Sequence, residues 1–351
     1  MIKVALIGCG NIFEEHIAAY KKCEDVEVVA LCDINEKRLK EKGEKHGIKK
    51  LYTDKNKMFE ENKIDAVSIC VPNYVHCECT LAALHAGCNV LCEKPMALNA
   101  AEAQLMEDEA KKAGKFLMIG FVRRHGNDCK ILKEFINSGY FGDLYYAKAT
   151  YLRRHGNPMG WFGEKAKSGG GPLIDLGVHV LDLVRYLFGN PKPVSVYGVT
   201  FQKLFNRPDI KGYKRYVSAS STPDDVCDVE DLASVMVRFD NGCALSFEAS
   251  FSLNIKEDTG TIELFGDKGG AKLSPELELF SEVNGYMCDT TLKTQTALSF
   301  DGLFYNEIRH FVDCVCGKCE TIAPAHDGVE IMRILDAAYE SAKTGHEVVL
   351  N

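Results

Sequence analysis

The sequence predicts an α/β protein with two domains, of which the first contains a doubly wound parallel sheet and the second a mostly antiparallel sheet. Short apolar runs alternate with helical periods up to about residue 122, and longer β-type runs follow after residue 140. The chain has 351 residues, 46% of them hydrophobic, which is more core than one domain usually holds. We therefore expect one domain over residues 1–122 and a second over residues 123–351.

Strand and helix signals alternate regularly in the first domain. Apolar runs predict strands over Ile2–Ile7, Val26–Leu31, Asp65–Val71, Asn89–Cys92 and Phe116–Phe121. The stretches between them are rich in Ala, Leu, Lys and Glu, and they predict helices over Ile12–Cys23, Glu36–His46, His76–Ala86 and Ala100–Ala113. This alternation is typical of a parallel sheet with helices on its faces.

The second domain begins with longer strand signals and ends with helical ones. Predicted strands cover Leu144–Leu152, Val194–Phe201, Leu232–Phe239, Cys243–Phe251 and Thr261–Phe265. Asn241-Gly242 predicts a tight hairpin turn with positive φ angles. Helices are expected over Leu173–Leu187, Phe304–Val315 and Asp327–Lys343, and a long loop over Lys203–Asp225.

A glycine-rich turn joins the first predicted strand to the first predicted helix. Gly8, Gly10, Asn11 and Ile12 stand where a Rossmann fold binds a dinucleotide, with the pyrophosphate against backbone N–H groups at the helix N-terminus. Phe13 replaces the third glycine, so the match is incomplete and a locally wider approach of helix to strand is expected.

Asp33 ends the second predicted strand, where a carboxylate binds the ribose 2′-hydroxyl of NAD. The same carboxylate would repel the 2′-phosphate of NADP. We therefore expect NAD, with NADP as an alternative because Arg38 follows on the next helix. In the competing interpretation, Asp33 only caps that helix.

Two segments carry the candidate chemistry. Glu93-Lys94-Pro95 follows a central strand at the carboxyl edge of the sheet, where ligands of such folds bind, although this tripeptide is also common in surface turns. In the second segment, glycines 169–171 would allow a close approach to a ligand, and Asp175 and His179 project from one face of the helix that follows. Imidazole can accept a hydroxyl proton while a carboxylate orients it. The competing interpretation, a polar helix face exposed to solvent, fits Asp182 better than it fits His179.

Further polar and aromatic residues would frame a substrate pocket. Guanidinium groups and aromatic faces suit polyhydroxylated ligands. An alternative for the arginines is ion pairing between the domains. The candidate residues are Arg123, Arg124, Arg153, Trp161 and Phe162.

Taken together, the motifs resemble those of the glucose-fructose oxidoreductase/inositol dehydrogenase/rhizopine-catabolism (Gfo/Idh/MocA) family. The resemblance covers essentially the whole chain and rests on four segments in order: G8-C-G-N-I, V71-P-N-Y-V-H76, E93-K-P and G169-G-G-P-L-I-D175-L-G-V-H179. It implies a Rossmann domain followed by an α/β domain on a large open mixed sheet. In an alternative arrangement, the C-terminal helix of the second domain packs back on the Rossmann domain. It also implies a homodimer or homotetramer formed through that sheet.

The resemblance also implies roles for individual residues. His179 would be the acid/base, Asp175 its partner, and Lys94 the group that orients the substrate hydroxyl, after a cis peptide before Pro95. The loop that carries Pro72, Asn73 and His76 would line the cofactor, and Glu93 would lie near the nicotinamide.

The implied activity is hydride transfer between a nicotinamide and a carbinol carbon of a sugar, sugar derivative or cyclitol. Two alternatives remain open. One is a glycosidase that retains NAD and acts by transient oxidation, and the other is a non-catalytic sugar or nucleotide sensor.

Composition argues against several other classes. A net charge of −8 without a basic block disfavours nucleic acid and acidic membranes, and the absence of a long apolar segment or signal-peptide pattern favours a cytoplasmic location. The fifteen cysteines are scattered as in a protein of reduced thiols. No metal is expected, because the cluster of Cys314, Cys316 and Cys319 lies at the end of a predicted helix and has no second C-x₂-C pair to complete the tetrahedron of a typical zinc site.

Overall fold

The computed structural model describes residues 1–350 except 206, 208–209, 213–215, 274–275 and 298. The chain divides into two compact units. Unit 1 comprises Met1–Val122 and Ser299–Met332, and unit 2 comprises Arg123–Leu298 and Arg333–Asn351. Residues 299–332, which the sequence assigned to the second domain, therefore belong with the first. The expected loop over Lys203–Asp225 lies partly outside the described residues, and its described part contains no helix or strand.

Unit 1 contains a six-stranded parallel sheet in the order β3-β2-β1-β4-β5-β6. This order is that of a Rossmann fold. The strands are β1 (Ile2–Ile7), β2 (Val26–Cys32), β3 (Leu51–Tyr52), β4 (Ala66–Ile69), β5 (Asn89–Glu93) and β6 (Leu117–Gly120). The helices are α1 (Asn11–Lys21), α2 (Glu36–His46), α3 (Lys55–Glu61), α4 (His76–His85), α5 (Ala100–Ala113) and α9 (Phe300–Val315).

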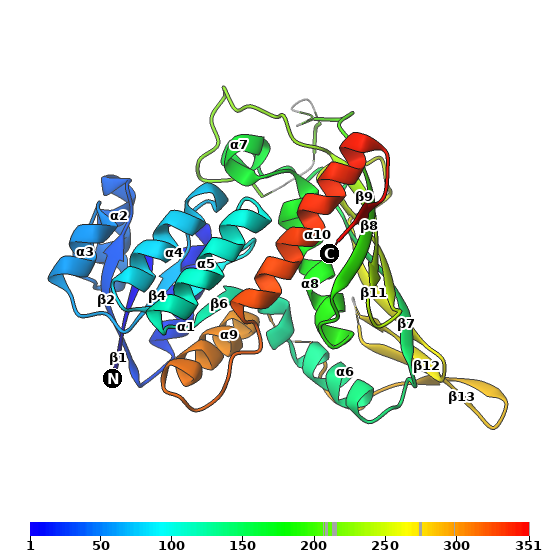
Figure 1. The fold of residues 1–351 in the computed structure, drawn as a ribbon. Helices are drawn as coiled ribbons and strands as arrows, with labels where there is room; N and C mark the ends of the chain where they lie inside the picture. Colours follow the sequence, from blue (N-terminus) through cyan, green and yellow to red (C-terminus); the bar gives the residue numbers. More distant parts are fainter. Residues whose placement is uncertain (206, 208–209, 213–215, 274–275, 298, 351) are drawn as a thin grey trace. The chain divides into compact units, whose positions relative to one another are not determined.

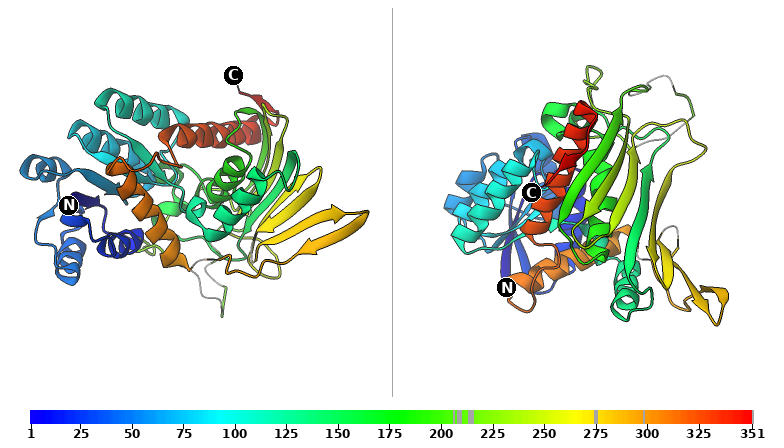
Figure 2. Two further views of the ribbon diagram at one scale, coloured as in Figure 1. Left: turned by 90° about the horizontal axis from the view of Figure 1, so that it is seen from below. Right: turned by 45° about the vertical axis from the view of Figure 1, so that its right-hand side comes forward.

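Helices cover both faces of this sheet, which explains why its strands are almost continuously apolar. Helices α4 and α5 lie on one face, and α1 and α9 lie side by side on the other (Figure 2). All four residues of β4 and of β6 are buried. The doubly wound sheet that the sequence predicted is thereby confirmed.

Unit 2 contains a nine-stranded mixed sheet in the order β14-β13-β12-β11-β7-β10-β9-β8-β15. Among the described strands of this sheet, only β7 and β10 pair in parallel. The strands are β7 (Leu144–Leu152), β8 (Pro193–Phe201), β9 (Leu232–Phe239), β10 (Ala244–Ser250), β11 (Thr259–Gly266), β12 (Gly269–Leu273), β13 (Glu278–Val283), β14 (Tyr286–Thr290) and β15 (Val348–Val349). The helices are α6 (Asn127–Asn137), α7 (Lys165–Ser168), α8 (Val178–Leu187) and α10 (Ala325–Thr344), whose first turns belong to unit 1.

The buried face of the unit 2 sheet carries alternating apolar residues. In β9, the buried residues are Ala233, Val235, Val237 and Phe239, and the residues between them are more exposed. Helix α8 contacts this buried face through β7 and β10 (Figure 1). This alternation is expected of a sheet that is covered on one face only.

The predicted hairpin turn differs from its expected form. Strands β9 and β10 do pair in antiparallel register, but of Asn241 and Gly242 only the glycine has a positive φ, +84°. Gly242 N–H donates to the Phe239 carbonyl, as in a turn of ordinary handedness followed by a left-handed glycine. No helix in the described part of the chain is long and apolar enough to cross a membrane.

Candidate active site

The turn between β1 and α1 has the backbone geometry of a phosphate-binding loop. Gly8 has a φ of +92°, and a β-carbon there would lie 2.4 Å from the carbonyl oxygen of Cys70, so only glycine fits. A β-carbon on Gly10 would meet no atom within 4 Å. Gly10 is also the N-cap of α1 and, as a glycine, has no side chain with which to cap this helix end. Asn11 and Ile12 form the first turn of α1, so an anion could reach this N-terminus.

Phe13, which stands in place of the third glycine, is buried in the core of unit 1. Its side chain is fully inaccessible, and its ring packs edge-on against the His46 ring at a centroid distance of 5.6 Å. The bulky residue is thus accommodated between α1 and the end of α2.

Asp33 lies at the carboxyl end of β2, directly beside this turn. Its Oδ2 accepts a hydrogen bond of 2.7 Å from the Cys9 N–H, and its Oδ1 accepts one of 2.8 Å from the Asn35 N–H. The cap of α2 is Asn35, whose side chain accepts from the Arg38 N–H. The interpretation of Asp33 as that cap is therefore wrong. The Arg38 guanidinium lies 3.5 Å from the Asp33 carboxylate.

The Lys94-Pro95 peptide is cis, as the family resemblance implied. His76 connects this peptide to the loop after β4, because its Nδ1 lies 2.7 Å from the Pro95 oxygen and its Nε2 lies 2.9 Å from the Val71 oxygen. Burial lowers the pKa of His76, and the two backbone oxygens that face its ring partly oppose this shift. His76 is 1% exposed, which favours a role in positioning over direct contact with a cofactor.

The neighbouring predicted residues occupy the same loop. Pro72 precedes a 3₁₀ helix over Asn73–Val75, and α4 follows it. Asn73 is 4% exposed and Pro72 is partly exposed. Of this loop, Pro72 is thus better placed than Asn73 to touch a bound molecule.

A buried hydrogen-bond network lies behind Lys94. Glu93 Oε1 accepts a hydrogen bond of 2.8 Å from His16 Nε2, and Glu93 Oε2 accepts one of 3.1 Å from the Lys94 N–H. The other ring nitrogen of His16 lies 3.2 Å from the Ser68 hydroxyl, which is 2.7 Å from the Tyr20 hydroxyl. This network fixes the end of β5, where Lys94 begins the next loop.

Glu307 of α9 faces the same network. It is fully buried, and neither of its carboxylate oxygens has a hydrogen-bond partner among the described residues. Burial, together with the nearby Glu93 carboxylate, raises the pKa of Glu307 well above its ordinary value. Oxygen atoms of Glu93 and Glu307 and a ring nitrogen of His16 lie within 4.8 Å of one another. Sequence reasoning missed His16 and Glu307, because neither belongs to a recognised motif.

In unit 2, the glycine block lies against protein groups. A β-carbon on Gly170 would lie 1.9 Å from the Tyr339 hydroxyl oxygen, and one on Gly171 would lie 2.5 Å from the Glu230 carbonyl oxygen. The Glu230 carboxylate accepts hydrogen bonds from the Gly171 N–H (3.0 Å), the Leu173 N–H (3.1 Å) and the Tyr339 hydroxyl (2.9 Å). These glycines therefore allow close packing around Glu230, and not the expected approach of a ligand. Sequence reasoning did not predict a role for Glu230.

The helix that follows carries Asp175 and His179. It begins as a π-helix over Leu173–Gly177 and continues as α8, so the helix predicted over Leu173–Leu187 is present with a wider first part. Such π segments often occur at functional sites. Asp175 and His179 are both partly exposed, as residues that meet a ligand must be, whereas most residues of this helix are buried.

Tyr151 and Arg153, at the end of β7, join this group. The Tyr151 ring lies 6.3 Å from the His179 ring, and the Arg153 guanidinium lies 5.4 Å from the centre of the Tyr151 ring. Burial alone would lower the pKa of Arg153, but Tyr151 and the carboxylates of Asp175 and Asp258 raise it. Arg153 is therefore a cation held beside Asp175. Sequence reasoning missed Tyr151, because it belongs to a predicted strand whose alternating pattern indicates only that the strand packs in a sheet.

Arg124 and Asp182 form a buried ion pair within unit 2. The Arg124 Nη2 lies 2.6 Å from Asp182 Oδ1, both side chains are at most 2% exposed, and the guanidinium lies 4.7 Å from the Tyr186 ring centre. The expectation of a solvated Asp182 is therefore wrong. We accordingly leave Arg124 out of the proposed substrate residues, since its charge is already neutralised away from solvent.

The remaining predicted substrate residues lie nearer the surface. Arg123 pairs with Asp128 at 3.2 Å and its side chain is 36% exposed. Trp161 and Phe162 stack at a centroid distance of 3.8 Å in a 3₁₀ helix over Gly160–Gly163. An accessible pair of stacked rings is compatible with binding the C–H face of a sugar.

Both parts of the sequence match family descriptions. Residues 2–121 match the oxidoreductase family with an NAD-binding Rossmann fold, and residues 133–350 match the C-terminal α/β domain of the same family. The chain belongs to the Gfo/Idh/MocA oxidoreductase family. As its family members do, this Gfo/Idh/MocA protein combines an NAD-binding Rossmann domain with an α/β domain, which confirms the fold class, the cofactor class and the oxidoreductase assignment.

Individual relatives support this assignment. The D-glucoside 3-dehydrogenase of Escherichia coli (strain K12) is 37% identical over 353 aligned positions, which cover 99% of this chain and 97% of the relative. The aldose-aldose oxidoreductase of Caulobacter crescentus, solved with glycerol, is 25% identical with a TM-score of 0.82 and covers 99% of both chains. A levoglucosan dehydrogenase complex with NADH, 23% identical, has the same fold with a TM-score of 0.86, covering 100% of this chain and 99% of that one.

Proposed function

We propose that this oxidoreductase moves a hydride between NAD and a secondary carbinol carbon of a sugar or sugar derivative, with a glucoside oxidised at a ring hydroxyl as the first candidate. The observation that carries the proposal is in unit 2, where His179 and Arg153 both lie beside the Tyr151 ring and the Asp175 carboxylate, one helical turn before His179, raises the pKa of Arg153. The full-length similarity to a D-glucoside 3-dehydrogenase supports the substrate class.

The proposed cofactor-binding residues are those of the β1–α1 turn and the end of β2. Gly8 and Gly10 would bring backbone N–H groups of α1 to the pyrophosphate, and Asp33 would accept a hydrogen bond from the ribose. When bound, NAD supplies the hydride acceptor. Asp33 has spare acceptor capacity for a hydroxyl, since each of its oxygens accepts only one hydrogen bond among those described above.

We assign three catalytic roles as proposals. His179 accepts the proton of the substrate hydroxyl as the C–H bond is broken, and Asp175 stabilises the imidazolium that forms. The Lys94 ammonium lowers the pKa of that hydroxyl. Arg123, Arg153, Trp161 and Phe162 would bind the remaining hydroxyl groups and C–H faces of the sugar.

The test is a substrate panel assayed for NADH absorbance and for released aglycone. Glucosides, free aldoses, anhydrosugars and cyclitols are supplied with NAD or NADP. We expect stoichiometric NADH from at least one glucoside or aldose. Release of aglycone without net NADH would instead indicate a glycosidase that oxidises its substrate transiently, and NAD binding without turnover of any compound would indicate a sensor.

We also propose a homo-oligomer that uses the second face of the unit 2 sheet. Tyr197 and Met236 are cross-strand neighbours on that face, 47% and 45% exposed. Helices α8 and α10 lie on the other side of this sheet (Figure 2). An apolar sheet face that remains exposed commonly marks a protein interface.

A cytoplasmic location is proposed as well, because all fifteen cysteines are unpaired, as is usual in a reducing compartment.

A further inference from the structure

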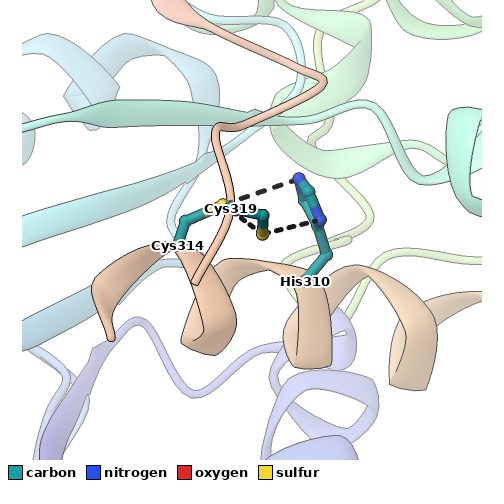
Figure 3. A group of neighbouring side chains, drawn as sticks. All are labelled: His310, Cys314 and Cys319. Atoms are coloured by element: carbon teal, nitrogen blue, oxygen red, sulfur yellow. Dashed lines mark hydrogen bonds between the residues drawn. The ribbon is translucent and has the colours of Figure 1, made fainter. Parts of the chain in front are cut away.

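A second cluster of chemically active side chains lies in unit 1, at the end of α9 and in the loop after it. Cys314 Sγ lies 3.6 Å from His310 Nε2 and 3.5 Å from Cys319 Sγ, and Cys319 Sγ lies 3.7 Å from His310 Nδ1. Figure 3 shows the three side chains pointing toward one another. None of them has a part in the proposed hydride transfer.

The local sequence explains why the three residues meet. His310 and Cys314 are four residues apart, so they lie on one face of α9. Gly317, with a φ of +70°, ends the helix, and hydrogen bonds from the Gly317 and Lys318 N–H groups to the last helical turn fold the chain back. This reversal brings Cys319 over the helix end.

The separations match those of ligands on one metal ion. Zinc binds sulfur at about 2.3 Å and nitrogen at about 2.0–2.1 Å, so neighbouring ligand atoms of a zinc tetrahedron are about 3.5–3.8 Å apart. The two sulfurs are 3.5 Å apart, Cys314 Sγ is 3.6 Å from His310 Nε2, and one ligand atom from each of the three residues lies within 4.8 Å of the others. Cys319 Sγ is nearest to the other ring nitrogen, Nδ1, so the Cys319 side chain must shift toward Nε2 when a metal binds there. Two thiolates and one imidazole are also the donor types that zinc prefers over harder cations.

One existing hydrogen bond would have to change. His310 Nε2 accepts from the Ile322 N–H at 3.1 Å, so a metal on this nitrogen would take the lone pair that the amide now uses. A single hydrogen bond between neutral groups is much weaker than a set of metal–ligand bonds. The exchange is therefore favourable when zinc is available.

We propose that His310, Cys314 and Cys319 form a structural zinc site, with Cys316 or a water molecule as the fourth ligand. The site is independent of the proposed sugar oxidation. It would connect the end of α9 to the segment that extends the parallel sheet, because the Ile119 N–H of β6 donates to the Ala323 oxygen at 2.9 Å and Met118 forms a β-bridge with Pro324. The spacing of the cysteines did not predict this site, because one of its ligands, His310, lies outside the cysteine segment.

The test measures zinc on the untagged full-length protein, reduced with a phosphine and freed of metal. Titration with zinc against a chromophoric chelator should reveal a tight site that takes up about one ion per chain. Cys319→Ser and His310→Gln should each weaken that site by about 100-fold or more. Cobalt bound to the wild type should show a thiolate charge-transfer band that Cys319→Ser loses.

Cys288→Ser is the matched control, because Cys288 is a partly exposed cysteine on β14, outside the cluster. This variant should retain the tight site and the cobalt band. The proposal is overturned if the reduced wild type has no tight zinc site, or if Cys319→Ser and His310→Gln bind zinc as the wild type does. Thiol titration before reduction shows whether Cys314 and Cys319 form a disulfide, and a disulfide without zinc binding after reduction also overturns it.

Discussion

Single ionisable side chains carry the proposed proton chemistry, and they differ from the residues proposed to bind NAD. His179→Ala removes the proposed acceptor of the hydroxyl proton, and Lys94→Ala removes the cation proposed to stabilise the developing alkoxide. Each substitution should reduce kcat by about 10²–10⁴-fold, while the Kd for NADH changes little. Steady-state kinetics and fluorescence titration with NADH measure the two quantities.

His346→Asn is a suitable control for the histidine variant, because His346 is exposed in the same unit. It should retain wild-type kcat. If His179→Ala or Lys94→Ala keeps near wild-type turnover on the same substrate, the role assigned to that residue is wrong.

Asp33 is expected to set the choice between NAD and NADP. Asp33→Ser removes the negative charge beside the ribose and leaves Arg38 unpaired for a 2′-phosphate. The ratio of kcat/KM for NAD to that for NADP should fall at least about tenfold, which corresponds to ~1.4 kcal/mol. An unchanged ratio would contradict the ribose contact.

At the scale of secondary structure, Glu230 determines how the helix with Asp175 and His179 begins. Glu230→Ala leaves the buried Gly171 and Leu173 N–H groups without their acceptor, at a cost of about 1–3 kcal/mol for each donor. We expect a lower free energy of unfolding together with a lower kcat. Glu230→Gln keeps one acceptor oxygen and should lose less of both. Equal stability of the two variants in urea denaturation would show that these hydrogen bonds contribute little.

Glu307 of α9 is buried where α9 meets α1 and the end of β5. We expect it to make the free energy of unfolding depend on pH. The pKa of Glu307 is raised in the folded state, so the folded chain retains a proton that the unfolded chain loses above the ordinary value of 4.5. The stability of the wild type should therefore fall as pH rises above that value. Glu307→Gln keeps a neutral side chain and removes this loss.

Urea denaturation at about pH 5 and about pH 8 tests the Glu307 prediction. The variant should gain stability relative to the wild type as pH rises, by up to about 1.4 kcal/mol for each pH unit. Parallel pH profiles of the wild type and Glu307→Gln would show that the Glu307 carboxyl group ionises normally.

For the molecule as a whole, the exposed sheet face of unit 2 predicts assembly. Tyr197→Glu combined with Met236→Lys places charges on neighbouring strands of this face, where a partner would have to desolvate them. Light scattering should show a dimer or tetramer for the wild type and a smaller species for the double variant. Tyr74→Glu, at an exposed residue of unit 1, should leave the mass unchanged. A monomeric wild type would refute the proposal.

Much of the fold was predictable because strand and helix periods are local properties. Strands β1, β7 and β9 and helices α2 and α5 have the predicted bounds. The two-residue strand β3 and the short helix α3 were missed, since so few residues show no periodicity. Strands β12–β14 were missed for another reason: β12 begins with two glycines, all three strands contain charged residues, and they depend on pairing with their neighbours.

The sequence by itself determined the family, the order of the longer strands and helices, and the residues proposed to carry the chemistry, because these properties reside in contiguous motifs. Only the tertiary structure decided which distant groups surround those motifs. It placed His16 and Glu307 next to Glu93. It also showed that Glu230 accepts hydrogen bonds from the glycine block and that Asp182 forms an ion pair with Arg124. Hydrogen bonds and ion pairs of this kind depend on separation in space, and residues far apart in the chain carry no local signal of their contact.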